Sequence, residues 1–382
     1  MESTGAAGTS SGIRRSRWIQ IAIVLASSAV ALLLAEWVVR LTGLVRQWHP
    51  AAQTAILQYY EDPNGPAYLI PNWEGYVSGA WTKINADGFR DVSHAPVAQP
   101  GVLRLAVVGD SYTMGDGVAL KDTYIKQLQA MLSPRFQIEV LNCGVTSTNT
   151  MNQLAALPRI LARYSPAVVV TAFNVNDFEV YTETRFERMS RDGGRFTVHD
   201  GGTVTMERHT GVFRGVKEQF REHSYLYRLA SELLPLLRGE RQDVVETVRR
   251  RFQTGEYARS VEALIKMRDL VEASHARFLV ALIPGLLDTP ASVTNMKDYP
   301  YLEEHRSICE KLSSRGVGCV DLAGAFGDRD PNALIVHRTN RHYNTEGHRL
   351  VATALGNYLE AHSAELLNSS STADGLQPTH PD

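Results

Sequence analysis

A serine hydroxyl stands at the end of an apolar strand, where enzymes often place a nucleophile. Residues 103–108 form a mostly apolar run that leads directly into Gly109, Asp110 and Ser111. In an open α/β sheet, the carboxyl ends of neighbouring strands leave a crevice in which ligands bind. A serine acts as a nucleophile when a base takes its proton and hydrogen-bond donors hold the developing oxyanion. The sequence therefore predicts nucleophilic chemistry at Ser111 if other segments supply these groups.

Three later segments offer the remaining groups, in chain order. Gly144 follows the second predicted strand, and its N–H can approach a reacting group closely because glycine has no Cβ. Asn176 follows the third strand and carries an amide donor, and His342 stands in a loop before the last predicted helix. We predict that His342 deprotonates Ser111. We also predict that the N–H groups of Ser111 and Gly144 and the amide of Asn176 form an oxyanion hole.

Each of these residues also has a structural explanation. Ser111 can cap a following helix, Gly144 can serve only a turn, and Asn176 can be an ordinary turn residue. His348 could replace His342 as the base, but it falls inside the last predicted helix, where a packing role is more common. The catalytic interpretation is favoured because the nucleophile, the two further oxyanion donors and the base all occur, in that order along the chain.

The four segments resemble the blocks that name the SGNH, or GDSL, hydrolase family. Ser111 matches the nucleophile of that family, Gly144 and Asn176 match the glycine and asparagine of its middle blocks, and His342 matches its base. The likeness covers roughly residues 100–362. It implies an enzyme that acts on acyl esters, a class that includes acetylated sugars, lipids and thioesters. Residues 84–91 also resemble a segment that precedes the hydrolase domain in membrane-anchored members.

The sequence departs from the family at the catalytic acid. The family pattern is Asp-x-x-His, and Thr339 stands at the acid position. Asn340 could accept the hydrogen bond of the His342 Nδ1–H, as asparagine does in papain-like triads. Alternatively, Asp328 or Asp330 could fold back into this role, or a backbone carbonyl could complete a Ser-His dyad.

We therefore predict a serine esterase, with two alternatives that remain open. One is an O-acyltransferase that acts on extracellular polysaccharide through the same acyl-enzyme. The other is a catalytically weak SGNH-like binding protein. The expected partner is a small-molecule or glycan ester.

The elements that must position these residues alternate along the chain. The predicted strands are residues 103–108, 138–141, 167–173, 278–283 and 317–322, and the predicted helices are residues 122–132, 150–164, 256–275, 301–314 and 345–362. Such alternation predicts a parallel sheet with helices on both faces. We predict a three-layer, flavodoxin-like α/β fold with strand order 2-1-3-4-5 and a switch point between the first and third strands.

The N-terminus carries a candidate membrane anchor. Residues 18–39 are apolar apart from four residues, and about 20 such residues in a helix cross a bilayer core. Three arginines precede this run and favour a cytoplasmic N-terminus. A cleaved signal peptide and a buried soluble helix are the alternatives. We predict a single-pass transmembrane helix with the catalytic domain on the extracytoplasmic side.

The predicted organisation has five parts. They are a disordered cytoplasmic N-terminus at residues 1–17, the anchor at 18–39, a membrane-proximal segment with short strands at 40–100, the hydrolase domain at 101–362, and a disordered tail at 363–382. Residues 178–240 form an insertion in the domain, with a hairpin at 195–206 and a helical stretch at 212–237. The insertion is either a lid or a surface elaboration without a catalytic role.

Composition excludes other classes of function. The chain has 382 residues and a net charge of −2, so no basic surplus points to nucleic acid. The histidines lack metal-ligand spacing, and the glycines at 115–117 lack the lysine-serine pair of a P-loop, so we predict neither a metal nor a cofactor. Cys309 and Cys319 could pair in an oxidising compartment, whereas three unpaired thiols are equally compatible with the sequence.

Overall fold

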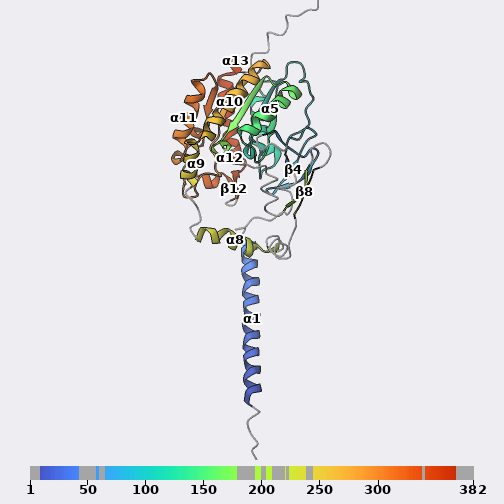
Figure 1. The fold of residues 1–382 in the computed structure, drawn as a ribbon, viewed down its shortest axis with the longest axis vertical. Coiled ribbons are helices and arrows are strands. Elements are labelled where there is room, and N and C mark those ends of the chain that lie inside the picture. Colours follow the sequence, from blue (N-terminus) through green and yellow to red (C-terminus); the bar gives the residue numbers. More distant parts are fainter. Residues whose placement is uncertain are drawn as a thin grey trace, which may run out of the picture. The chain divides into compact units, whose positions relative to one another are not determined.

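The described part of the chain divides into two units (Figure 1). The computed structural model describes residues 9–42, 57–59, 65–178, 194–198, 204–208, 220, 223–237, 244–337 and 340–366. One unit comprises residues 1–48 and 210–241, and the other comprises residues 49–209 and 242–382. Residues 210–240 of the predicted insertion fall in the unit that also contains the N-terminal helix.

A five-stranded parallel sheet forms the centre of the second unit. Its order is β11-β10-β7-β5-β6, and every neighbouring pair is parallel. The strands are β5 (Leu103–Gly109), β6 (Ile138–Gly144), β7 (Val168–Phe173), β10 (Arg277–Leu282) and β11 (Gly318–Asp321). In chain order this is the predicted order 2-1-3-4-5. Because β5 lies between β6 and β7, the carboxyl ends of these three strands meet at one edge of the sheet.

Helices cover both faces of the sheet. The residues of β5 alternate between two core clusters, with Leu105 and Val107 in one and Ala106 and Val108 in the other. The first cluster includes residues of α4 (Tyr124–Leu132) and α12 (Thr345–Ala361), and the second includes residues of α5 (Thr150–Tyr164), α10 (Gly255–Ala273) and α11 (Leu302–Ser313). Burial on both faces explains why these strands are continuous apolar runs. The three-layer α/β prediction is confirmed (Figure 1).

Two local differences from the prediction lie at the carboxyl edge. β6 continues to Gly144, so this glycine ends the strand and does not follow it. His342 was predicted in a loop, but it lies on β13 (Asn340–Tyr343), which pairs antiparallel with β12 (Ile335–His337). Strands of three or four residues are too short for alternation to be recognised in a sequence.

Short antiparallel pairs precede the sheet, as predicted for residues 40–100. They are β1 (Leu57–Tyr59) with β2 (Ala67–Leu69), and β3 (Glu74–Val77) with β4 (Ala80–Lys83). A turn follows in which the Gly88 N–H donates to the Asn85 carbonyl, and Gly88 has a φ of +82° that favours glycine. The connection predicted at residues 43–55 lies outside the described residues.

The predicted hairpin of the insertion is present as β8 (Gly194–Val198) and β9 (Val204–Arg208), although its predicted turn at 200–202 lies outside the described residues. Of the helical stretch predicted at 212–237, the structure describes α8 (Tyr225–Leu237). A further helix, α9 (Val244–Phe252), was not predicted, although Val244, Val248 and Phe252 recur at helical spacing in its sequence.

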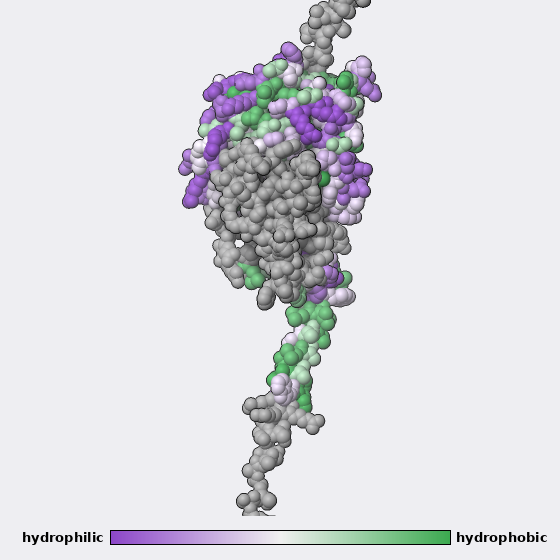
Figure 2. Space-filling view, turned by 45° about the vertical axis from the view of Figure 1, so that its right-hand side comes forward, coloured by the Kyte–Doolittle hydropathy of each residue, from purple (hydrophilic) through white to green (hydrophobic). Residues whose placement is uncertain are grey.

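α1 (Thr9–Thr42) contains a segment, Trp18–Thr42, that is long and apolar enough to cross a membrane, a criterion that a signal sequence also meets. Figure 2 shows the hydrophobic residues along this helix. The helix starts inside the segment predicted to be disordered, because extending a formed helix fixes one residue for each new hydrogen bond. At the other end of the chain, α13 (Ser363–Leu366) occupies the start of the predicted tail, and residues 367–382 lie outside the described residues.

Glu36 of α1 caps the N-terminus of α8. Its carboxylate accepts the N–H groups of Tyr225 and Leu226 at 2.9 and 2.8 Å, and the Ser224 hydroxyl at 2.9 Å. Arg40 pairs with the same carboxylate at 2.8 Å. The first N–H groups of a helix have no partner within it, and a carboxylate there also opposes the helix dipole. This arrangement accounts for an acidic residue in an apolar helix.

Cys309 of α11 and Cys319 of β11 form a disulfide, which resolves the alternative that the sequence left open. Cys143 on β6 is buried and unpaired. The disulfide joins α11 to β11, which is an edge strand of the central sheet.

Candidate active site

Ser111 is held where β5 turns into a helix. It is the first residue of α3 (Ser111–Met114), and the Asp110 carboxylate caps this helix by accepting the Tyr112 N–H at 2.9 Å. Gly115 ends the helix with a φ of +84°, a conformation that glycine adopts without strain. The strand and the two caps together fix the serine hydroxyl at the carboxyl edge of the sheet.

His342 lies within hydrogen-bond distance of Ser111. The distance from His342 Nε2 to Ser111 Oγ is 2.7 Å, although the residues are 231 positions apart in the chain. The other ring nitrogen, Nδ1, lies 2.6 Å from Oδ1 of Asn340. An amide oxygen can only accept, so this bond requires the proton on Nδ1 and leaves Nε2 free to accept from the serine.

Asn340 therefore accepts the hydrogen bond from His342 Nδ1, a role for which the sequence left several candidates open. It precedes His342 by two residues on β13, and side chains two apart on a strand share one face. Asp330 instead caps the short 3-10 helix Pro331–Ala333, and Asp328 is exposed. Thr339, at the family's acid position, lies outside the described residues.

Gly144 packs directly against α3, and a Cβ at this position would clash with the backbone of Thr113 and Met114. The absence of a Cβ at Gly144 therefore allows β6 to pack against α3. The Gly144 N–H donates to the Asn142 side-chain oxygen at 3.0 Å, however, so in this structure the predicted oxyanion donor is engaged within the chain.

Asn176 lies on the 3-10 helix η2 (Val175–Phe178), directly after β7. Its side chain hydrogen-bonds the Asp110 carboxylate, which also accepts from the Asn174 amide at 3.2 Å. The amide predicted as an oxyanion donor is therefore next to the residue that precedes Ser111. Burial raises the pKa of Asp110, although these hydrogen bonds and the Tyr112 N–H oppose the change.

Asp177 shares this buried polar cluster. Its carboxylate accepts the Asn174 N–H at 2.8 Å and the Gln153 amide at 3.0 Å. Burial, reinforced by the nearby Asp110, raises the pKa of Asp177 well above its usual range. These contacts tie the end of β7 to α5 and hold the Asn176 segment in place.

The contacts of His348 indicate a structural role, in contrast to those of His342. It is buried in α12, where its Nδ1 accepts the Tyr124 N–H at 3.2 Å and its ring stacks on the Tyr124 ring. Burial lowers the pKa of His348 to about 3, and the charges of Arg90 and His342 add to the effect. The ring is neutral at physiological pH and joins α12 to α4.

Sequence reasoning missed Asp116 and Arg90. Asp116 follows α3, and its Oδ2 lies 4.0 Å from His342 Nε2. Arg90 is buried and donates to the carbonyl oxygens of Gly115 and Val118 on either side of Asp116. Asp116 could have been recognised from its place between Gly115 and Gly117, directly after the segment that carries Ser111.

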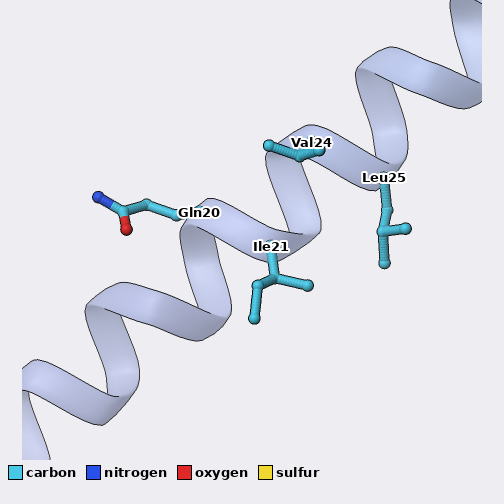
Figure 3. A pocket seen from close by; sticks show the side chains of 4 residues that line it. All are labelled: Gln20, Ile21, Val24 and Leu25. Carbon is cyan, nitrogen blue, oxygen red and sulfur yellow. The ribbon is translucent and has the colours of Figure 1, made fainter.

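Outside this site, the described residues offer little for chemistry. Figure 3 shows a shallow hollow on α1 that is lined by Gln20, Ile21, Val24 and Leu25. These residues lie on one exposed helix and include no group that could activate a nucleophile. No group of three or more side chains suited to hold a metal ion occurs within the residues that the structure describes.

The comparisons with known proteins identify the family. The model of the GDSL-like lipase/acylhydrolase family matches residues 107–350. The search of the curated proteins gives no match.

Several solved structures are similar to this chain at low identity. The crystal structure of TesA is 15% identical, with 68% of this chain and 98% of that chain covered and a TM-score of 0.39. The acetyl xylan esterase AlAXEase is 15% identical, with 67% and 100% covered and a TM-score of 0.37. A catalytic mutant of Axe2, an acetylxylan esterase from Geobacillus stearothermophilus, is 15% identical, with 68% and 93% covered and a TM-score of 0.38.

At these identities and TM-scores, the structural likenesses support no conclusion about this chain. The family match is different in kind, because it spans well over half of the chain and contains Ser111, Gly144, Asn176 and His342. The chain belongs to the GDSL-like lipase/acylhydrolase family of ester-hydrolysing enzymes.

Proposed function

We propose that this protein is a serine esterase that hydrolyses acyl esters, including O-acetyl esters, through an acyl-enzyme on Ser111. The observation that carries this proposal is the 2.7 Å contact between Ser111 Oγ and His342 Nε2 at the carboxyl edge of the sheet. A neutral imidazole whose Nδ1–H is held by Asn340 has its other nitrogen available to take the serine proton.

In the proposed mechanism, Ser111 Oγ attacks the ester carbonyl carbon while its proton passes to His342 Nε2. The carbonyl oxygen becomes an oxyanion, for which the N–H groups of Ser111 and Gly144 and the Asn176 amide are the proposed donors. The Gly144 N–H must leave or share the Asn142 oxygen to take part. The C–O bond then breaks, and His342 returns the proton to the departing alcohol oxygen.

The second half of the reaction repeats these roles with water. His342 takes a proton from a water molecule, whose oxygen attacks the acyl carbon of the Ser111 ester. The proton then returns to Ser111 Oγ as the carboxylic acid is released. The net reaction consumes one ester and one water and regenerates the free serine.

We also propose that α1 anchors the enzyme to a membrane, with the hydrolase unit on the extracytoplasmic side. The apolar segment Trp18–Thr42 and the arginines that precede it support this topology. The Cys309–Cys319 disulfide adds support, because disulfides persist mainly in oxidising compartments. N-terminal sequencing of the mature protein tests the anchor, since a cleaved signal peptide would leave a chain that starts after the apolar segment.

The esterase proposal is tested with the Ser111→Ala variant of the full chain. We expect this variant to lose turnover of p-nitrophenyl acetate and labelling by a fluorophosphonate probe. The matched control is Ser133→Ala, which alters an exposed serine on the surface and should keep both. Wild-type turnover by Ser111→Ala would refute the proposal. Acyl transfer to an added xylooligosaccharide, in preference to water, would reassign the enzyme as an O-acyltransferase.

A further inference from the structure

A second carboxylate lies beside the Ser111–His342 pair. The Oδ2 atom of Asp116 is 4.0 Å from His342 Nε2, and the Asp116 side chain is only 10% exposed. Its Oδ1 atom is buried and has no hydrogen-bond partner among the described residues. Burying a carboxylate oxygen without a partner is unfavourable, so this position calls for an explanation in terms of the site.

The loop that carries Asp116 is fixed on both sides. The Asp116 N–H donates to the Ser111 carbonyl at 3.1 Å, and Gly117 has a φ of +90°. A Cβ at Gly117 would lie 2.8 Å from Val336 Cγ2 and 3.1 Å from Asn340 Nδ2. The loop therefore packs closely against the hairpin β12–β13, which holds the Asp116 carboxylate near the ring of His342.

Arg90 places a positive charge under the same loop. Its guanidinium donates to the carbonyl oxygens of Met114 and Val118, the latter at 2.6 Å. Burial lowers the pKa of Arg90 to about 10, and the Asp116 carboxylate opposes this change. Arg90 is therefore charged at neutral pH and is attracted to the Asp116 carboxylate.

The other groups around His342 differ from Asp116. Asp110 interacts electrostatically with His342, but its carboxylate already accepts hydrogen bonds from the Tyr112 N–H and the Asn174 amide. His348 is neutral, as described above. Asn340 holds Nδ1 through an amide, which carries no net charge. A carboxylate in a Ser-His-Asp triad both orients the histidine and stabilises the imidazolium, and here only the first of these functions is met by the residue at Nδ1.

We propose that Asp116 supplies the negative charge that stabilises the His342 imidazolium, while Asn340 orients the ring. This inference rests on the proposed esterase function. When the Ser111 proton moves to His342 Nε2, the positive charge develops 4.0 Å from Asp116 Oδ2. No proton passes to Asp116, and the step is otherwise unchanged. The two functions of one triad carboxylate are thus divided between residues on opposite sides of the ring.

The test is the Asp116→Asn variant of the full chain, assayed with p-nitrophenyl acetate. We expect kcat to fall by about 10- to 100-fold, because a charge at this distance is lost from a partly buried site, with KM changed by less than about twofold. The matched control is Asp122→Asn, which makes the same substitution in the neighbouring 3-10 helix η1 (Leu120–Asp122) and should keep wild-type kinetics.

A rescue variant separates the supply of charge from a merely structural role. If Asp116 supplies charge, Asn340→Asp should raise the kcat of Asp116→Asn by at least about tenfold and that of the wild type by less than about threefold. A wild-type kcat for Asp116→Asn, or a loss confined to KM that Asn340→Asp does not restore, would overturn the inference. If Asp116→Asn does not fold, a gain of more than about tenfold from Asn340→Asp alone would also overturn it, and a gain below about threefold supports it.

Ser111→Ala, assayed beside these variants, keeps the two proposals apart. If it retains full activity, the esterase proposal fails and this inference fails with it. If it is inactive while Asp116→Asn is unaffected, only the role of Asp116 is wrong.

Discussion

Replacing Asn340 with alanine tests whether one amide holds the ring of His342. In the structure, Asn340 Oδ1 lies 2.6 Å from His342 Nδ1, and the His342 side chain is only 14% exposed. Without Asn340, the Nδ1–H group has lost its partner and has little access to water. Leaving a partly buried donor unpaired costs about 1–3 kcal/mol. If that loss falls on the transition state, the rate falls by about 5- to 150-fold.

The assay compares two reactions that depend on the same serine. We expect kcat/KM for p-nitrophenyl acetate and the rate of fluorophosphonate labelling of Ser111 to fall by similar factors. The matched control is Asn357→Ala on the exposed face of α12, which should leave both rates unchanged. A kcat/KM within twofold of wild type, with an unchanged melting temperature, would show that another group holds Nδ1 and would refute the reasoning.

Three further predictions concern the scaffold. Gly144→Ala places a Cβ against the backbone of Met114, so we expect a loss of about 1–3 kcal/mol in the free energy of unfolding and reduced esterase activity; equal urea midpoints would contradict this. Burial lowers the pKa of His348 from 6.5 to about 3, so below about pH 6.5 the unfolded chain binds a proton that the native chain does not. Stability should therefore fall by about 2 kcal/mol between about pH 7 and pH 5, and His348→Asn should remove this part of the fall, which urea unfolding at both pH values measures. Replacing Cys309 and Cys319 together by alanine removes a covalent link across 10 residues. The free energy of unfolding should fall by about 2–3 kcal/mol, while esterase activity persists. If the wild type and the double variant unfold at the same urea concentration, this prediction is wrong.

The sequence by itself determined the architecture and the positions of the main candidates. Apolar runs and amphipathic stretches are local patterns, and they predicted five strands in the observed order, with helix α5 matched at both ends. Parallel strands bring their carboxyl ends to one edge of the sheet, so the sequence alone predicts that Ser111, Gly144 and the segment of Asn176 lie together. Because the four family blocks are themselves short stretches of sequence, the family could be recognised as well.

Only the tertiary structure decided which groups surround His342. Asn340 meets Nδ1 because both residues lie on a four-residue strand of a hairpin that shows no periodicity in the sequence. Asp116 reaches the other side of the ring because Gly117 lets its loop pack against that hairpin. The contact between Asp116 and His342 joins residues that are 226 positions apart, and its distance depends on how the loops pack. Local pattern carries no information about that packing, and so the division of charge and orientation between Asp116 and Asn340 could be inferred only from coordinates.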